Sequence, residues 1–389
     1  RNGYSACKLL SVNDFCHLAQ AQTSTMVHSI VRPLREGLHR VYGHERLLDR
    51  ISSSLAAGRF PQATLLTGPP GVGKQRIALW VAQGVLCERG PAAPCGTCHS
   101  CKQLERLSHP DLHWFVPIPR PKAAEPDKQV EEAAALLAEA MAERRANPVY
   151  GRPDGLASHA IASVRLLHRI VSLRPFQGPR RAVILANAER LVVQEASPEA
   201  ANALLKLLEE PPAGTYLLLT SSEPQGLLPT IRSRLVPVRV GGVGDDAVRQ
   251  FLRSELEPPI KGAALEQRVL MAEGSIGRAV GAAPPGSGAA QATERTLAAL
   301  QGGGAHHWAR AALAQAPWSA RGEFTTMLDA LAVRLRDRLL ERASADAAAA
   351  RRLSLAIRQV EEIRAVAQGN VNPQLALAVL ARRLEHLAA

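Results

Sequence analysis

The chain has 389 residues, of which 46% are hydrophobic, so it can build two or three folded domains and is not a disordered protein. It shows no run of about 18 apolar residues and no secretory pattern, so we expect no membrane partner and a cytoplasmic location. Lysine and arginine total 47 against 35 acidic residues, a net charge of +12 that admits DNA or another acidic partner. Aromatic residues are only 4%, which argues against a stacking platform for single strands.

Residues 1–25 are predicted to be a non-native or disordered extension, because the chain opens without methionine and the first one is Met26. Apolar residues then recur at helical spacing over 46–57. A short apolar run at 63–67 predicts a buried strand, and a further amphipathic pattern predicts a helix over 74–85.

A glycine-rich turn joins that strand to that helix. Gly68 and Gly73 flank four residues that include Gly71, and Lys74 follows, which is the spacing of a phosphate loop. Strand, turn and helix start together direct backbone N–H groups at a phosphate-sized anion, and Lys74 adds a positive charge. Gln75 stands where a Ser or Thr would hold Mg²⁺, and an amide is a poor ligand for that ion. The sequence therefore predicts a phosphate-loop fold with a weakened or lost nucleotide site.

Four of the six cysteines form a cluster after this helix. Cys95, Cys98 and Cys101 are spaced C-x-x-C-x-x-C, and Cys87 lies upstream across a Gly/Pro loop. Four thiolates close a tetrahedral zinc site and leave no position for a catalytic water. We expect a structural zinc module over 87–101, with His99 exposed beside it; the alternative is a set of free thiols.

The middle of the chain alternates strands and helices. A strand is predicted over 112–116, a helix over 161–173, and a buried strand over 182–185. The Pro-, Ala- and charge-rich block 117–158 is predicted to be a surface insertion, with a solvated helix over 130–145.

The acids of an active phosphate-loop ATPase are missing after the buried strand. Such an enzyme carries there one acid for Mg²⁺ and one that aligns water, whereas this chain has Ala186 and Asn187. Glu189 is displaced by two or three positions, and the alternative interpretation is a surface acid that opens the next helix.

A helix over 198–210 and a strand over 216–219 continue the alternation, which predicts a parallel α/β sheet with helices on both faces. Glycines at 241–244 form a plausible hinge before a small helical unit. From about residue 293 the chain is predicted to be helical, with breaks at 302–304 and 369–373.

These patterns divide the chain into three expected domains. They are a phosphate-loop domain (residues 26–240), a small helical lid (241–290) and an all-helical C-terminal domain (291–389). A Pro/Gly/Ser-rich linker is expected at 283–289.

Several stretches resemble the AAA+ clamp-loader subunits of bacterial DNA polymerase III. The segment AANALLKLLEEPP at 200–212 is similar to their most recognisable stretch, and Ser233-Arg234 is similar to their arginine-finger motif. A four-cysteine module directly after the phosphate-loop helix is typical of them, and NVNPQL at 370–375 resembles the end of their delta-prime members. The resemblance covers Met26 to the C-terminus apart from the insertion.

The resemblance implies an AAA+ module, a lid and a helical collar that assembles a five-subunit ring. Gln75, Ala186 and Asn187 depart from the motor subunits and agree with the delta-prime type, which is regarded as the stator. Arg234 would then act in trans in the ATP site of the adjacent motor subunit; the finger motif usually ends in Cys, where this chain has Leu235.

The resemblance also implies the remaining contacts. Arg278 would lie where a lid arginine touches nucleotide, with ATP binding weak or absent, and Ser221 and Ser222 occupy the polar-sensor region. The implied partners are the motor (gamma/tau) and delta subunits, with the sliding clamp and primer-template DNA contacted through the complex. The chain would be a subunit of the DNA-directed DNA polymerase (nucleotidyltransferase) holoenzyme without ATPase or polymerase activity of its own. Polymerase chemistry is not expected in the chain because no carboxylate cluster for a two-metal site is evident.

Two other functions stay open at this point. One is an active AAA+ motor-type ATPase that uses Lys74, with Glu189 replacing the missing acids. The other is a zinc-dependent nucleic-acid binder built on the cysteine module, which has few basic residues, Lys102 and Arg106, and few aromatic ones.

Overall fold

The structure is a computed structural model. It describes residues 32–33, 38, 40–146, 157–191, 199–257, 259–281, 288–302, 305–315, 321–342, 346–367 and 371–388. The predicted extension at 1–25 and most of the predicted linker at 283–289 lie outside these ranges. Among the described residues, every helix is too short or too polar to cross a lipid bilayer.

A five-stranded parallel sheet forms the centre of the N-terminal part. Its order is β3-β4-β5-β2-β6, and every pair is parallel. The strands are β2 (Ala63–Thr67), β3 (Leu112–Phe115), β4 (Arg181–Leu185), β5 (Thr215–Ser221) and β6 (Val236–Arg239). The predicted parallel sheet is thus confirmed. Strand β6 was not predicted, because it is an edge strand with mostly exposed side chains and an internal proline, and therefore carries no buried apolar run.

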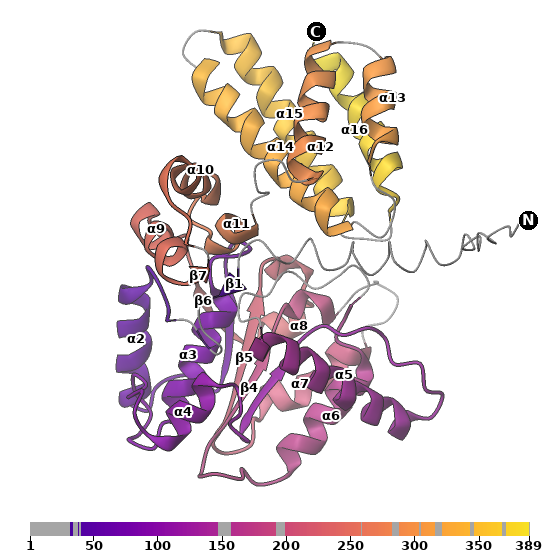
Figure 1. The fold of residues 1–389 in the computed structure, drawn as a ribbon. Coiled ribbons are helices and arrows are strands. Elements are labelled where there is room, and N and C mark those ends of the chain that lie inside the picture. The colour runs from indigo at the N-terminus through magenta and orange to yellow at the C-terminus, as the bar shows by residue number, and fades with distance from the viewer. Residues whose placement is uncertain are drawn as a thin grey trace, which may run out of the picture.

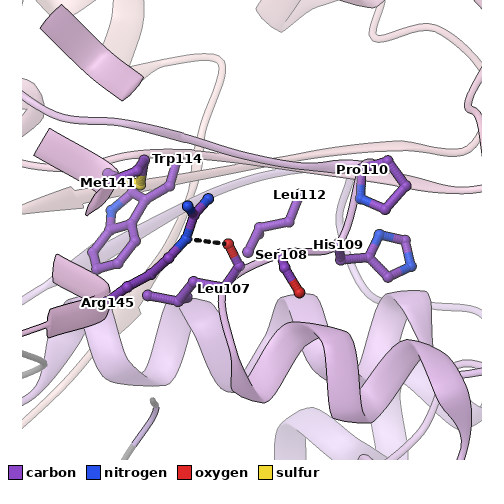
Figure 2. Close-up of a pocket in the computed structure, with 8 residues that line it drawn as sticks. All are labelled: Leu107, Ser108, His109, Pro110, Leu112, Trp114, Met141 and Arg145. Carbon is purple, nitrogen blue, oxygen red and sulfur yellow. Dashed lines mark hydrogen bonds between the residues drawn. The ribbon is translucent and has the colours of Figure 1, made fainter. Parts of the chain in front are cut away.

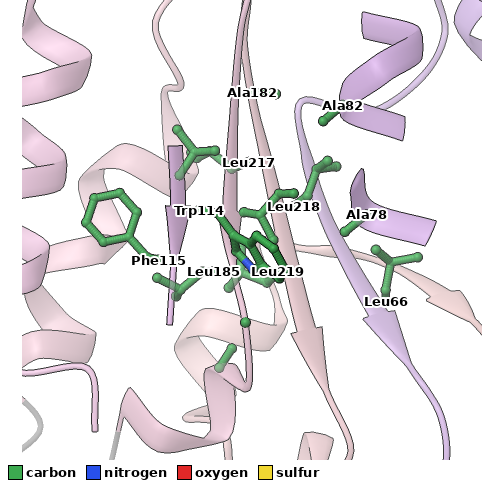
Figure 3. Close-up of a cluster of buried hydrophobic side chains, with 14 of the residues drawn as sticks. Leu66, Ala78, Ala82, Trp114, Phe115, Ala182, Leu185, Leu217, Leu218 and Leu219 are labelled. Atoms are coloured by element: carbon green, nitrogen blue, oxygen red, sulfur yellow. The ribbon is translucent and has the colours of Figure 1, made fainter. Parts of the chain in front are cut away.

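Helices cover both faces of this sheet. In Figure 1, α2, α3 and α4 lie on one side of the strands and α5, α6 and α7 on the other. Figure 3 shows Ala78 and Ala82 of α3 close to the strand that bears Leu66, and small side chains there allow the helix to approach the sheet. The helices of this part are α2 (Glu45–Ala56), α3 (Lys74–Leu86), α4 (His99–Glu105), α5 (Pro126–Ala146), α6 (Ile161–Ser172), η1 (Ala188–Leu191), α7 (Glu199–Glu209), η2 (Pro224–Gly226) and α8 (Pro229–Arg232).

Helix α5 is packed and not solvated, which corrects the prediction for 130–145. Val130, Ala133 and Leu137 are buried and belong to the core of the sheet domain. Their spacing places them on one helical face, a stripe that the alanine-rich composition of the block obscures. The ends of the predicted insertion are also held together, because Ile118 and Ser158 exchange two backbone hydrogen bonds of 3.1 and 2.9 Å.

Two further buried clusters follow in the chain. We refer to α9 (Asp245–Ser254), α10 (Gly262–Ala272) and α11 (Ile276–Gly281) as the lid helices; a short ribbon of β1 (Arg32–Pro33) and β7 (Leu256–Glu257) accompanies them. The C-terminal bundle has its own core and consists of α12 (Gly288–Gly302), α13 (Ala305–Leu313), α14 (Arg321–Arg342), α15 (Ala347–Ala367) and α16 (Pro373–Ala388). The domain limits 26–240, 241–290 and 291–389 stay predictions.

Candidate nucleotide and metal sites

The glycine-rich loop lies between β2 and α3, as its spacing predicts. Gly68, Gly71 and Gly73 have φ values of +153°, +77° and +98°, a region that side-chain-bearing residues rarely adopt. There is also no room for a side chain, because a Cβ on Gly68 would lie 2.0 Å from the Val240 carbonyl oxygen. The loop conformation therefore requires glycine at these positions.

Lys74 is buried and directed back onto the loop. Its Nζ donates to the carbonyl oxygens of Gly68 and Pro69, at 2.9 and 2.8 Å, and to Ser222 Oγ at 2.9 Å. An ammonium group has three protons, and these three acceptors match them. The lysine thus joins the loop to the end of β5, where the predicted sensor residues lie.

The position expected for Mg²⁺ is surrounded by hydrogen-bonded amides. Gln75 Nε2 donates to Asn187 Oδ1 at 2.9 Å, and Gln75 Oε1 accepts from Arg144 Nη1 at 3.1 Å. Arg144 is 9% exposed, and its guanidinium stacks on the Trp114 ring, 4.4 Å from the centroid. Mg²⁺ requires several oxygen ligands in near-octahedral geometry. Here both amide oxygens already accept hydrogen bonds, and one donor is a cation that repels a second cation.

Arg144 is the functional-site residue that sequence reasoning missed. It lies seven residues after Leu137, which itself lies seven residues after Val130, so all three share one face of α5. An arginine on a buried stripe needs a partner inside the protein. That spacing was available in the sequence, but a helix assumed to be solvated gave no reason to use it.

Glu189 lies in the first turn of η1, the short helix that follows β4, so it does open the next helix; it is half-buried and not a surface residue. Its Oε1 lies 3.5 Å from both the Ser222 amide and Asn187 Nδ2. Its other oxygen is buried, and no donor among the described residues reaches it. The structure therefore brings Glu189 to the edge of the network that contains Lys74.

Two hydrogen bonds to backbone carbonyls of the phosphate loop join the start of α11 to that loop. The Gly277 amide donates to the Gly71 carbonyl at 2.9 Å, and Ser275 Oγ donates to the Pro70 carbonyl at 3.0 Å. The Arg278 guanidinium, by contrast, forms an ion pair with Glu273 of the same lid. The predicted contact of this arginine with nucleotide stays a prediction.

Arg234 follows α8 and binds the end of α7. Its Nε donates to Glu209 Oε1 at 2.7 Å and its Nη1 to the Thr230 carbonyl at 2.7 Å. The side chain of Arg234 is 30% exposed. The two stretches that carry the family resemblance, LLEEPP and Ser-Arg, are thus in direct contact.

The four clustered cysteines fit a tetrahedral metal. All four Sγ atoms lie within 4.8 Å of one another. Two pairs are 4.0 and 3.9 Å apart, Cys87 with Cys98 and Cys95 with Cys101. Zinc–sulfur bonds of about 2.3 Å in a tetrahedron place sulfurs about 3.8 Å apart, so the set matches zinc. His99 is exposed, as predicted.

Local hydrogen bonds favour the thiolate form of Cys95. Backbone N–H groups of Thr97 and Cys98 lower the pKa of the Cys95 thiol to about 5, while burial raises the pKa of Cys101. Zinc would supply the charge that keeps the buried sulfur deprotonated. Cys87 ends α3 and Cys98 caps α4, so the metal would join the end of one helix to the start of the next.

A separate cavity of about 260 Å³ lies between α5 and the turn before β3 (Figure 2). In Figure 2, Arg145 Nε donates to the Leu107 carbonyl at 3.1 Å across one side of it. No residue predicted from the sequence to bind nucleotide or metal lines this cavity: its walls are Leu107, Ser108, His109, Pro110, Leu112, Trp114, Met141 and Arg145.

Comparison with known proteins points to one replication family. The family model described as "DNA polymerase III, delta subunit" matches residues 43–243, more than half of the chain. The delta-prime subunit of DNA polymerase III from Pseudomonas aeruginosa is 35% identical over 55% of this chain and 53% of the relative. The tau subunit from Salmonella typhimurium is 30% identical over 54% of this chain and 26% of the relative.

The chain thus spans about half of that delta-prime relative and about a quarter of the tau relative. A gamma-subunit-related protein of DNA polymerase III from Thermotoga maritima, known as a crystal structure, covers 88% of this chain and is itself covered completely. The two proteins share 15% sequence identity, with a TM-score of 0.41. The match of the family model over more than half of the chain shows that the chain belongs to the family described as "DNA polymerase III, delta subunit".

Proposed function

We propose that the chain is the stator of the DNA polymerase III clamp loader and helps to load the sliding clamp onto primed DNA. The observation that carries this proposal is the Arg144–Gln75–Asn187 network at the phosphate loop. ATP hydrolysis by a phosphate-loop enzyme requires Mg²⁺ between the β- and γ-phosphates. A buried guanidinium and two mutually bonded amides disfavour that ion, so the site is a degenerate one.

In this proposal Arg234 acts on a neighbour. An arginine supplied in trans stabilises the charge on the transferred phosphoryl group, an effect worth ~10³–10⁵ in rate. Arg234 is partly exposed at the end of a short helix, and Glu209 holds its guanidinium by an ion pair. Such a pair orients the side chain while leaving it able to exchange partners, because half-exposed ion pairs contribute only about 0–1 kcal/mol.

The other parts take supporting roles. The neighbours would be the motor (gamma/tau) and delta subunits in a five-subunit ring, joined through the C-terminal bundle as a collar. The zinc would be structural, since four protein ligands leave no open position. DNA would be followed through its phosphates by the basic ring interior and not read by sequence.

A motor-type ATPase is the alternative, and two observations favour it. Lys74 is present in a well-formed loop, and Glu189 lies near Ser222, which Lys74 contacts. The test is ATP binding and hydrolysis by the purified chain with Mg²⁺, beside Lys74→Ala. The stator proposal expects no hydrolysis by either protein. Hydrolysis that Lys74→Ala abolishes would make the chain a motor.

A further inference from the structure

A row of alternating charges joins the lid helices to the C-terminal bundle. Glu273, directly after α10, forms an ion pair with Arg278 of α11. It also accepts two hydrogen bonds from Arg336 of α14, one on each carboxylate oxygen. The row continues inside the bundle through side chains of α14 and α15 that pair at 3.4 Å or less: Arg336, Glu361, Arg364 and Asp329. Glu273 is therefore the acid at which the lid meets the bundle.

The backbone at Glu273 has a conformation that favours glycine. Its φ and ψ are both 46°, in the left-handed region, and Gly274 after it has a φ of +75°. Helices often end on a residue in this conformation, and that residue is usually glycine because a Cβ is strained there. A backbone outlier of this kind points to a role for the side chain that it carries. Here the side chain is the carboxylate that binds Arg278 and Arg336.

The residues after Glu273 tie the same segment to the phosphate loop. The Gly274 carbonyl accepts a 2.9 Å hydrogen bond from the Val243 amide, in the stretch predicted to be a hinge. A Cβ on Gly274 would lie 3.0 Å from the Val243 carbonyl oxygen, so the two backbones pack directly. Ser275 and Gly277 then make the two hydrogen bonds to the phosphate loop described above. Residues 273–277 thus connect the bundle, residues 242–243 and the phosphate loop within five positions.

The contact between lid and bundle is made of charge and not of a shared core. Among the described residues, the buried clusters of the lid and of the bundle have no member in common, and Figure 1 shows them as separate groups of helices. The side chains of Glu273 and Arg336 are 36% and 31% exposed. Ion pairs at such positions are weakened by salt, whereas the two-oxygen geometry fixes the direction of the contact while it lasts.

We propose that Glu273 is an ion-pair latch, which holds the bundle at a fixed angle to the lid helices and the phosphate loop. When the latch is closed, Arg278 and Arg336 share the Glu273 carboxylate, and the bundle and the lid move as one body. When it is open, the bundle reorients while Ser275 and Gly277 keep the lid on the phosphate loop. Dissolved ions favour the open state because they screen the charges. The latch belongs to the single chain and does not depend on the proposed function.

The test is single-molecule energy transfer in the purified full chain. The dyes are attached to noncanonical amino acids at Ser53 of α2 and Ser354 of α15, which are both exposed, so that the cysteines stay unlabelled. The unaltered chain should give one narrow distribution at low salt. Glu273→Gln and Arg336→Gln should each raise the fraction of molecules outside that distribution at least about five-fold. The double variant should match either single variant, because both substitutions remove the same contact.

The matched control is Glu294→Gln, which breaks an ion pair with Arg334 inside the bundle and should change that fraction less than about two-fold. Glu273→Gly keeps the left-handed backbone and should open the latch as Glu273→Gln does, which assigns the effect to the carboxylate. Raising the NaCl concentration from about 0.05 to about 1 M should broaden the distribution of the unaltered chain and leave that of Glu273→Gln unchanged.

Three results would overturn the inference. The first is the same low-salt distribution for Glu273→Gln and the unaltered chain. The second is a distribution as broad with Glu294→Gln as with Glu273→Gln. The third is a loss of hydrogen-exchange protection throughout α14 and α15 in Glu273→Gln, which would mean that Glu273 supports the folding of the bundle and not its angle to the lid.

Discussion

Substitution of Arg144 removes the cation beside the position where Mg²⁺ would bind, and the loss of stability follows from the contacts that Arg144 makes. Arg144→Ala deletes a stacking contact with Trp114, worth about 1–2 kcal/mol when desolvated, and a charge-assisted hydrogen bond to Gln75, worth about 1.5–3 kcal/mol. The two contacts share one group and are not fully additive. We expect the free energy of unfolding to fall by about 2–4 kcal/mol.

The assay is urea denaturation of the full chain, with hydrogen exchange as a local readout. Glu143→Ala is the control, because Glu143 is the exposed neighbour of Arg144 on α5 and should change stability by less than about 0.5 kcal/mol. Exchange should accelerate in Arg144→Ala at Gln75 and Asn187. A stability within about 0.5 kcal/mol of the unaltered chain, with unchanged exchange there, would refute the reasoning.

Three further predictions concern other parts of the molecule. Burial lowers the pKa of His159 from 6.5 to about 4. As the pH falls, His159 is therefore protonated in the unfolded chain before it is protonated in the folded chain. Stability should therefore fall by up to about 1.4 kcal/mol per pH unit as the pH drops from 6.5 to 4, and thermal melts of His159→Gln should lack that contribution. Gly277→Ala places a Cβ 2.7 Å from Gly71 Cα, so backbone hydrogen exchange in the phosphate loop should become faster. In the control Gly241→Ala the added Cβ meets nothing within 4 Å, so the exchange rate should stay unchanged. Metal analysis should find one zinc per chain, and Cys98→Ser or chelation should unprotect residues 87–105 while the sheet stays protected; a metal-free chain with full protection there would contradict the zinc site.

Much of the fold follows from the sequence because the core strands are continuous apolar runs. Strands β2, β4 and β5 are buried on both faces, so their continuous apolar runs predict strands. The spacing of the glycines likewise predicts the turn between β2 and α3. Strand β6 was not predicted, because it is an edge strand with mostly exposed side chains and has no continuous apolar run. Helix boundaries marked by Gly302 and Pro373 were predictable for the same local reason, since neither residue favours a helix interior.

Most residues of the candidate site were predicted from the sequence, but Arg144 and the contacts between the residues were not. The spacing gave Lys74 and the absent acids, yet nothing local indicates that Gln75 bonds Asn187, 112 residues away, or that α5 brings Arg144 to them. The exposure of Leu173 and Phe176 was likewise not predictable, because apolar residues in a sequence are expected to be buried. Such pairings are made by the tertiary fold.

The central proposal is that this chain completes the ATP site of a neighbour, while its own nucleotide site is degenerate. The most direct measurement is single-turnover ATP hydrolysis by a reconstituted loader that contains the unaltered chain, Arg234→Ala or Arg232→Ala. Arg232 is an exposed arginine two residues away and serves as the matched control. We predict that a loader with Arg234→Ala loses ATP turnover at one motor site, whereas a loader with Arg232→Ala hydrolyses ATP at the same rate as the unaltered loader. Equal turnover with Arg234→Ala and with the unaltered chain would contradict the claim.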